Sequence, residues 1–499
     1  MKNIIKITII ATMILVSSCE DFLQIDPQSG QVTESSFFKT EKDFDSFMFG
    51  AYAEYTGHFN NSGIVMPLFI GGQIMQDIIY TDQSTKELAS YMSPSNGDFV
   101  DHWKTNYSVI SKVNLILAKL PDAPIDSDLK PKLEAEAKFL RGFAYYHLAN
   151  AYGNLPLITT TYEASQGNMS CTPETEVWEL VISDLAFASK YLPTNSELES
   201  NSIGRATKGA AFAFLAASYM NTKDWANAEK ASIDLMNLGE YGLLPNVRDV
   251  FNPDAPNTRE SIFEIQERLI KDNQIDWGGP APARGSTLPT DTAPQNIGGF
   301  WAPGGGWGGF TANRKLADSF DPADERRTKL MVIPGERYKG SRMSATLTIP
   351  LFPRWDKSAW TTKYWVGPNP AGSGASYLSD SNIIAMRYAE FLLNYSEILF
   401  ELGKTDQAYL QLNKIRDRAK LPALVASGDR DTFITALMKE RRWELNYEPN
   451  LWYHFMRTRT AADYLQNEYG ITMNEAWNKF PIPQSEIDQN PNLCQNVGY

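Results

Sequence analysis

The sequence has few of the residues on which most metal and redox sites depend. It contains three cysteines and four histidines among 499 residues. No histidine stands at metal-ligand spacing from another histidine or a cysteine, which argues against a zinc site. Cys171 and Cys494 can pair in an oxidising compartment, but two cysteines do not make a disulfide framework. We therefore expect no metal and no cofactor.

Signatures of catalysis are also absent. The sequence has no Gly-x-Ser-x-Gly nucleophile elbow, and no dinucleotide-binding motif opens a helix. The triple glycine at residues 304–306 is followed by Trp307 rather than by the Gly-Lys-Ser/Thr of a phosphate-binding loop. A glycosidase needs two carboxylates placed across one bond, but a pair can always be chosen among 59 Asp and Glu residues. We predict that the chain is not an enzyme.

Dense positive charge is missing as well. The chain has 46 Lys and Arg residues against 59 Asp and Glu, which gives a formal net charge of −13 at pH 7. No block of consecutive Lys and Arg residues stands out against this acidic background. Since polyanions bind through such positive surfaces, we predict that neither nucleic acid nor anionic lipid is a partner.

The N-terminus has the layout of a cleavable export signal. Two lysines precede an apolar run at residues 7–16, which is shorter than the roughly 20 residues needed to span a bilayer. Residues 16–19 then resemble a bacterial lipobox, in which the peptidase cuts before the cysteine and the cysteine carries the acyl chains. We predict a signal peptide at residues 1–18 and lipid attachment at Cys19. The alternative is an ordinary signal peptide with an incidental cysteine.

Apolar residues that recur at three- and four-residue steps predict a mainly α protein. In the first half of the chain, long helices are expected at residues 103–120, 133–152, 173–191, 207–220 and 224–238. In the second half, they are expected at residues 388–402, 405–420 and 432–447. Gly153 is a plausible end for the second of these helices. Strand signals are few, short and scattered.

Two helix pairs fit the tetratricopeptide pattern of about 34 residues. The first pair has all five template positions filled, by Phe212, Leu215, Ala216, Tyr219 and Ala228. The second fits less closely, with Leu392, Tyr395, Ser396, Leu399, Ala408, Leu412 and Ile415. In such repeats, small residues let two helices approach and large ones fill the groove of the next hairpin. Ordinary antiparallel helix pairs are the alternative.

Two long segments outside the helices are rich in aromatic residues. Residues 273–309 are also rich in Gly and Pro, and residues 351–380 are similar. Loops of this length are usually functional or disordered. Because disordered segments are poor in aromatics, we interpret both as ordered surface loops.

Four ordered stretches closely resemble signatures of the SusD/RagB family. They are LRGFAYYHLANAYGNLPL at residues 140–157, MRYAEFLLNYSE at 386–397 followed by NKIRDRA at 413–419, ERRWEL at 440–445, and the C-terminal residues 481–499. Gly142 and Ser396 stand where the family more often has Ala. With the lipobox, these stretches cover both ends and the middle of the chain.

The resemblance implies a SusD-like fold, in which tetratricopeptide-type helical hairpins pack against a loop-rich lobe with few short strands. It divides the mature chain into residues 19–240 and 241–499, within one compact unit. It also implies a lipoprotein of the outer membrane, facing the cell exterior, that binds an oligosaccharide and delivers it to a SusC-like TonB-dependent transporter. Peptide cargo is the first alternative. The second is a tetratricopeptide-type scaffold that binds only protein, which has no need of exposed aromatic loops.

We expect the ligand site in the aromatic loops. The first candidates are Trp277, Trp301 and Trp307, and the second are Tyr91 and Trp360. These residues lie outside the periodic helices, so core packing does not require them. Their glycine-rich neighbours let backbone approach a ligand closely, and the flat face of an aromatic ring suits the C–H face of a sugar. The alternative is that some of these tryptophans fix their own loops to the body.

Charged residues within the family-like stretches are expected to be structural. They occur in regular helices at spacings typical of a core, and buried charges normally pair with one another. We predict such pairing, rather than a ligand site, for Arg141, Tyr145, Arg387, Glu390, Arg441 and Glu444.

Overall fold

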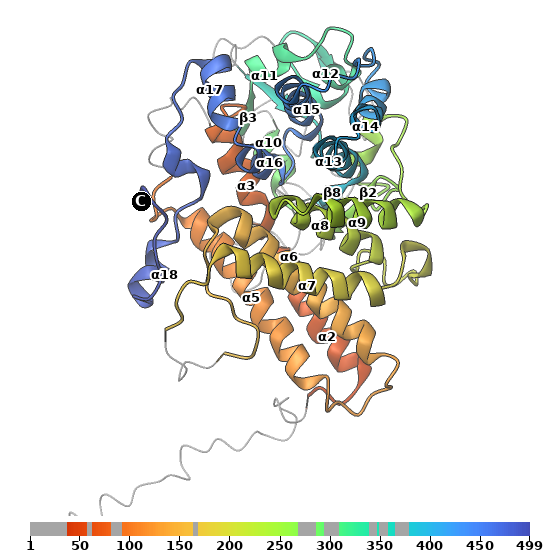
Figure 1. Ribbon diagram of the computed structural model, residues 1–499, viewed down its shortest axis with the longest axis vertical. Coiled ribbons are helices and arrows are strands. Elements are labelled where there is room, and N and C mark those ends of the chain that lie inside the picture. The colour runs from red at the N-terminus through yellow and green to blue at the C-terminus, as the bar shows by residue number, and fades with distance from the viewer. Residues whose placement is uncertain are drawn as a thin grey trace, which may run out of the picture.

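Helices predominate in the structure, as predicted (Figure 1). The computed structural model describes residues 37–56, 62–80, 92–162, 168–267, 286–293, 309–338, 347–348, 358–364 and 379–499. In Figure 1, most helices of the N-terminal half lie in the lower part of the view and most of those of the C-terminal half lie in the upper part; α3 (Ser62–Ile74) and α18 (Gln484–Gln489) are exceptions. All eight long helices predicted from the sequence are present, and each end lies within six residues of its expected position.

The N-terminal half is a series of packed helices. They are α2 (Glu41–Tyr52), α3 (Ser62–Ile74), α5 (Gly97–Lys119), α6 (Lys130–Tyr152), α7 (Glu174–Tyr191), α8 (Lys208–Asn221) and α9 (Trp225–Asn237), with the short 3-10 turns η1 (Ala53–Tyr55), η3 (Asn195–Glu197) and η4 (Val247–Phe251). From α5 to α9, each helix packs against the next. α2 lies against α5 and α6.

Side-chain caps and glycine set the ends of these helices. The Thr207 hydroxyl accepts a hydrogen bond from Ala210 N at the start of α8, at 3.2 Å. Asp224 accepts one from Asn227 N at the start of α9, also at 3.2 Å. Such caps satisfy backbone donors that have no partner within the helix. α6 ends at Gly153 with φ of 78°, a conformation that glycine adopts at low cost, so the predicted stop is confirmed.

The C-terminal half combines helices with short antiparallel strands. Its helices are α10 (Leu288–Thr292), α11 (Arg314–Ser319), α12 (Glu325–Leu330), α13 (Tyr388–Glu401), α14 (Thr405–Arg418), α15 (Arg430–Leu445), α16 (Leu451–Thr458), α17 (Ala461–Tyr469), η6 (Glu475–Asn478) and α18 (Gln484–Gln489). A four-stranded sheet has the order β1 (Ile78–Tyr80), β3 (Phe310–Asn313), β7 (Ser358–Thr361) and β4 (Met331–Val332). β2 (Ser261–Ile265) pairs with β8 (Ile383–Arg387), and β5 (Arg337–Tyr338) pairs with β6 (Leu347–Thr348).

Both helix pairs that fit the repeat pattern pack together, α8 with α9 and α13 with α14. The small residues at their contact are buried, among them Ala216 and Ala228 in the first pair. In the second pair, the Ser396 hydroxyl donates to the Ala408 carbonyl at 2.8 Å. The serine that departs from the family pattern therefore still serves the close approach of the two helices.

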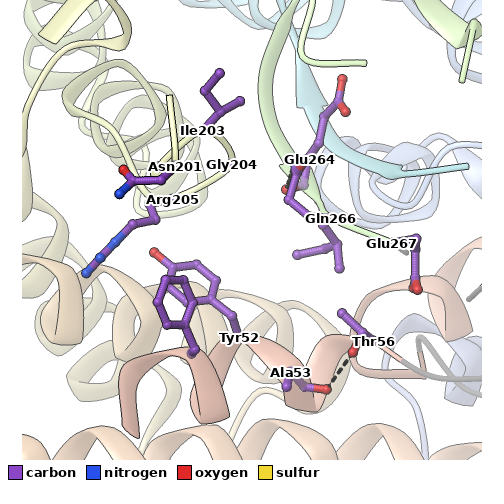
Figure 2. Close-up of a pocket in the computed structure, with 12 residues that line it drawn as sticks. Tyr52, Ala53, Thr56, Asn201, Ile203, Gly204, Arg205, Glu264, Gln266 and Glu267 are labelled. Carbon is purple, nitrogen blue, oxygen red and sulfur yellow. Dashed lines mark hydrogen bonds between the residues drawn. The ribbon is translucent and has the colours of Figure 1, made fainter. Parts of the chain in front are cut away.

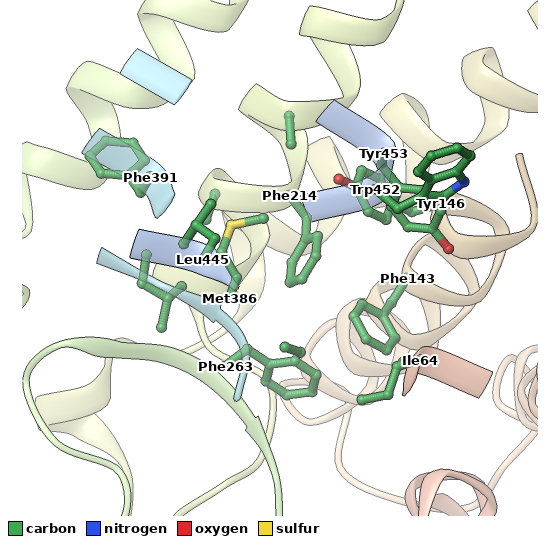
Figure 3. Close-up of a cluster of buried hydrophobic side chains, with 14 of the residues drawn as sticks. Ile64, Phe143, Tyr146, Phe214, Phe263, Met386, Phe391, Leu445, Trp452 and Tyr453 are labelled. Atoms are coloured by element: carbon green, nitrogen blue, oxygen red, sulfur yellow. The ribbon is translucent and has the colours of Figure 1, made fainter. Parts of the chain in front are cut away.

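Aromatic side chains from four elements form the centre of the core (Figure 3). Phe143 of α6 lies 5.0 Å from Phe214 of α8 and 5.3 Å from Phe263 of β2, measured between ring centroids. Tyr146 of α6 contacts Tyr453 of α16 at 6.3 Å. The core thus crosses residue 240, and the division of the mature chain at that position stays a prediction.

The charged residues of the family-like stretches pair inside the protein, which confirms their structural assignment. Arg141 donates two hydrogen bonds to Asp184, at 2.7 and 2.9 Å. Arg441 donates to Glu397 at 3.0 Å. All four side chains are buried, so their charges compensate one another where water cannot.

Glu390 and Tyr145 also have internal partners. Glu390 lies 3.0 Å from His454 Nε2 and accepts a hydrogen bond from the Asn450 amide at 3.2 Å. Burial raises the pKa of Glu390 to about 7. The Tyr145 hydroxyl accepts a hydrogen bond from Ile158 N at 2.7 Å. These contacts hold α6 and α13 to neighbouring segments.

A larger buried ion cluster surrounds Arg387 at the start of α13. Its guanidinium donates to Glu444 at 2.6 Å, to Glu448 at 2.6 Å and to Glu260 at 2.9 Å. Arg418 donates to the same Glu260 at 2.7 Å. Since these side chains are all buried, the cluster joins β8, α14, α15 and the start of β2 without contact with solvent.

Candidate functional site

Five of the six residues predicted to bind ligand or lipid, Cys19, Tyr91, Trp277, Trp301 and Trp307, lie outside the described residues. The sixth, Trp360, lies in β7 opposite Val332 of β4. Its side chain is wholly buried. That burial fits packing of the sheet better than contact with a ligand, and we leave Trp360 out of the site considered below.

A cavity of about 300 Å³ lies between the end of α2 and the end of β2 (Figure 2). Residues 201–205, which connect η3 to α8, form a third side. Glu267, at the end of the second side, is the last described residue before position 286. The aromatic loop predicted to bind ligand begins at residue 273, six positions further along the chain. The cavity therefore lies where the chain enters that loop.

Two apolar side chains remain exposed at this cavity. Phe49 on α2 is 48% exposed, and Ile203 is 56% exposed. Large apolar side chains this accessible are uncommon in the described part of the chain. Two of them on one cavity create apolar surface whose burial by a ligand is favourable.

Two carboxylates hold Arg205 in place at the cavity. Its guanidinium donates two hydrogen bonds to Glu136, one of them at 2.8 Å, and pairs with Asp45 at 2.9 Å. It also lies 5.2 Å from the centroid of the Phe49 ring, within the range of a cation–π contact. Burial acts to lower the pKa of Arg205, but the bonds and charge of Glu136 outweigh burial and raise it. The cavity thus keeps a positive charge beside an exposed ring.

Tyr52 lines the floor of the cavity. Its ring, rather than its hydroxyl, is available to a ligand, because the hydroxyl already has two partners in the protein. The hydroxyl donates to Glu136 at 2.7 Å and accepts a hydrogen bond from Ala206 N at 2.9 Å. Burial, followed by the charge of Glu136, raises the pKa of Tyr52 well above its ordinary value. The side chain therefore stays a neutral phenol with a fixed orientation.

The wall opposite Tyr52 is built from amide and carboxyl groups that hold one another in place (Figure 2). The side-chain amides of Gln266 and Asn257 exchange two hydrogen bonds, each of 2.9 Å. Glu264 accepts hydrogen bonds from Asn257 N at 3.0 Å and from the Asn382 amide at 2.7 Å. Burial raises the pKa of Glu264. With both of its oxygens accepting from the protein, Glu264 supports the wall rather than presenting a carboxylate for bond cleavage.

Gly204 permits the close approach of the third side to this wall. Its φ is 94°, and a Cβ atom there would lie 2.3 Å from Gln266 Cγ. A side chain at position 204 would displace Gln266. No cavity residue was predicted from the sequence. The isolated Ile203-Gly204 pair within a polar linker is the one signal that could have pointed to this segment.

The cavity suits binding more than chemistry. Its described lining combines exposed apolar faces with amides, an arginine and the carboxyl groups of Glu264 and Glu267, and includes no Ser, Cys or His. In the described part of the chain, no cluster of His, Cys, Asp and Glu residues could hold a metal ion. None of the described helices has the length and apolar character required to cross a membrane.

Two protein-family models match the chain. The model for the SusD family matches residues 283–499, and one described as starch-binding and associating with the outer membrane matches residues 21–220. The chain belongs to the SusD family. The second description associates this family with the outer membrane.

Curated relatives extend over nearly the whole SusD-family chain. The SusD-like protein P2 of Formosa agariphila is 27% identical and covers 99% of each chain. A SusD-like protein of Bacteroides ovatus is 22% identical over 95% of this chain and 85% of its own. Both ends of the chain therefore have counterparts in members of the family.

Solved structures confirm the predicted SusD-like fold. A SusD-like protein from Bacteroides fragilis superposes with a TM-score of 0.75 at 21% identity, over 94% of this chain and 99% of its own. A laminarin-binding SusD-like protein gives 0.76 at 23% identity, over 92% and 100%. Surface glycan-binding protein A from Bacteroides thetaiotaomicron, in complex with laminarihexaose, gives 0.72 at 22% identity, over 92% and 99%.

Proposed function

We propose that this protein is a lipid-anchored, cell-surface member of the SusD family that binds an oligosaccharide and delivers it to a SusC-like TonB-dependent transporter. The observation that carries glycan binding is the cavity of Figure 2, whose lining combines the exposed Phe49 and Ile203 with the side-chain amide of Gln266, which Asn257 holds in place. A sugar can pack its C–H face against the apolar side chains and form hydrogen bonds from its hydroxyl groups to the amide. Peptide cargo is the alternative ligand.

The proposed binding site continues from the cavity into the loop of residues 273–309. Trp277, Trp301 and Trp307 are its first candidates there, and Tyr91 is the next. The order of the chain supports this continuation, since the end of β2 lines the cavity and the loop begins eight positions later. Aromatic faces in the loop and the Phe49 ring would then contact successive sugar units of one ligand.

The relatives suggest which glycans to test first. One structural neighbour is a laminarin-binding SusD-like protein, and another was solved in complex with laminarihexaose. The purified mature chain is to be titrated with laminarihexaose, with a malto-oligosaccharide and with a peptide mixture, in a calorimeter. We expect heat of binding from at least one glycan. Binding of peptides alone would favour the alternative cargo, and a chain that captures only protein would favour the scaffold.

The loop tryptophans are tested one at a time. Replacement of Trp277, Trp301 or Trp307 by Ala at a true contact should weaken binding roughly tenfold, since an aromatic contact contributes on the order of 1–3 kcal/mol. The melting temperature should stay nearly constant, whereas a tryptophan that fixes its own loop would lower it. If all three variants bind the glycan as the wild type does, the loop is not the site.

The anchor and the transporter are tested separately from the ligand. Replacement of Cys19 by Ala should release the protein from the membrane fraction, because the acyl chains that hold it there are lost. A variant that stays bound to the same extent contradicts lipidation. Purification in mild detergent should recover one large outer-membrane transporter in near-equal amount, and recovery of this chain alone in several detergents argues against that partner.

A further inference from the structure

The two cysteines beyond the predicted lipobox meet in the fold, although 323 positions separate them. The backbone N–H of Cys494 donates a hydrogen bond to Cys171 Sγ at 3.2 Å. Both side chains are free thiols in the structure; Cys171 is half-buried and Cys494 is exposed. Besides Cys19, the sequence contains no other cysteine.

Neighbouring hydrogen bonds hold the two cysteine segments side by side. The Asn490 amide donates to the Met169 carbonyl at 2.8 Å, and the Asn492 amide donates to the Asn168 carbonyl at 2.8 Å. Three donors from residues 490–494 thus contact residues 168–171. The meeting of the thiols is therefore part of an ordered contact between two segments.

The distance between the cysteines is within the reach of a disulfide. An N–Cα bond is about 1.46 Å long, so Cα of Cys494 lies no more than about 4.7 Å from the Cys171 sulfur, given the hydrogen bond of 3.2 Å. The two bonds from that sulfur to its own Cα put the two Cα atoms no more than roughly 7.5 Å apart, a limit that overlaps the 4.4–6.8 Å of disulfide-bonded cysteines. Partial burial raises the pKa of Cys171, and the adjacent Cys494 thiol adds to this increase. Because the backbone of Cys494 already contacts the Cys171 sulfur, rotation of the Cys494 side chain is the main movement that bonding requires.

We propose that Cys171 and Cys494 form an intramolecular disulfide in the exported protein. Its oxidant is the disulfide of a thiol–disulfide oxidoreductase, since such bonds form in oxidising compartments. The exposed Cys494 thiolate attacks one sulfur of the enzyme disulfide, and the Cys171 thiolate then displaces the enzyme from the mixed disulfide. One S–S bond breaks in the enzyme and one forms in the chain. Two electrons and the two thiol protons pass to the enzyme, which leaves as a dithiol.

The bond would secure the C-terminal segment, residues 479–499, against the N-terminal helices. Phe480 N donates to the Ala151 carbonyl at 2.8 Å, and Gln484 N donates to the Pro94 carbonyl at 2.9 Å. A covalent bond at Cys494 prevents this segment from separating from the body and limits access by proteases.

The test uses the mature chain isolated from the membranes of cells that export it. Free thiols are alkylated in denaturant without reductant, the protein is then reduced, and new thiols are labelled with an isotopically heavier reagent. We expect both cysteines to carry the heavier label, and we expect the unreduced digest to contain the two peptides linked. Light label on both cysteines, or linkage to a second chain, overturns the proposal.

Matched variants and oxidation in vitro complete the test. In Cys171→Ser, Cys494 should take the light reagent, and Cys494→Ser should expose Cys171 in the same way. Reduced, folded wild type treated with oxidised glutathione should form the internal disulfide, whereas stable glutathione adducts on both cysteines contradict it. This measurement needs neither glycan nor transporter, so its failure is distinct from failure of the proposed function.

Discussion

Two groups of arginine and carboxylate side chains in this protein differ in what surrounds them. Around Arg387 every partner is buried, and its guanidinium donates to Glu260, Glu444 and Glu448. Around Arg205 burial is only partial, since Asp45, one of its two carboxylate partners, is 31% exposed and the guanidinium lies 5.2 Å from the half-exposed ring of Phe49. The Arg205 side chain itself is 17% exposed, against 0% for Arg387.

The comparison separates support from binding. A wholly buried cluster has each charge balanced by another and leaves no room for a ligand. A partly exposed cluster holds its side chains in place by ion pairs and leaves part of its surface accessible to a ligand. Residue type alone does not distinguish the two, because both use arginine with aspartate or glutamate. The same substitution in each cluster therefore tests the distinction directly.

The largest effect is expected from Arg387→Met. Removal of this guanidinium leaves Glu260, Glu444 and Glu448 in the protein interior with fewer cations, and breaking a buried ion pair costs about 3–5 kcal/mol. We expect the free energy of unfolding in urea to fall by that amount, with unchanged glycan affinity in the folded fraction. Arg430→Met is the control. Its pair with Glu401 is exposed, at 58% for the arginine side chain, and should contribute less than about 1 kcal/mol. Equal effects from the two variants would contradict the structural role of the cluster.

A smaller loss of stability is expected from Arg205→Met, accompanied by a loss of binding. The variant leaves buried Glu136 without two hydrogen bonds from a charged partner, which costs about 1–3 kcal/mol. It also removes the cation beside the Phe49 ring. We expect a lower urea midpoint and a weaker glycan affinity, measured by calorimetry at a temperature where the variant is folded. An affinity equal to that of the wild type would place the ligand away from this cavity.

Phe49→Ala should weaken binding without affecting stability. The ring is 48% exposed, so the folded protein loses little by its removal, but a bound sugar loses a flat apolar face. Such a contact is worth about 1.4 kcal/mol, or tenfold in Kd. The control is Leu410→Ala on α14, where a side chain 58% exposed lies outside the cavity. If both variants bind the glycan like the wild type while their melting temperatures stay constant, Phe49 is not part of the site.

Periodicity in the sequence predicted the helices because burial on one face of a helix repeats every three to four residues. The structural ion pairs were predictable for a related reason. Arg141, Arg441 and Glu444 lie on helices amid apolar neighbours, where an unpaired charge is too costly to persist. Their partners were not predictable, since Asp184 and Glu397 lie 43 and 44 positions from the arginines that they contact.

The cavity could not be predicted in this way. Its three sides come from residues near positions 50, 203 and 266, and no local pattern places these segments together. Exposure of Phe49 also depends on the tertiary structure. Both Phe44 and Phe49 lie on α2, but only Phe44 is buried. Trp360 shows the opposite case. It was expected in a surface loop but lies buried in β7; because all four residues of this strand are buried, no alternation of exposed and buried positions marks it in the sequence.

The smallest effect concerns a buried histidine far from the cavity lining. His147 on α6 is wholly buried beside Tyr453, with its Nδ1 3.4 Å from the tyrosine hydroxyl. Burial lowers the pKa of His147 from its ordinary 6.5 to about 3. Below pH 6.5 the unfolded chain therefore binds a proton that the native protein does not bind, so stability falls as the pH is lowered. Between pH 7 and pH 6 this residue alone should cost about 0.7 kcal/mol.

His147→Gln removes that titration while His102 and His454 titrate as before. The difference in unfolding free energy between the wild type and this variant should shrink by about 0.7 kcal/mol between pH 7 and pH 6, measured by urea denaturation at each pH. Since the described cavity lining contains no histidine, wild-type glycan affinity should stay constant over the same interval. A difference that does not change with pH would mean that His147 takes up a proton in the native core as readily as in the unfolded chain. A pH-dependent affinity would instead mean that the contrast between an acid-sensitive interior and an insensitive cavity is wrong.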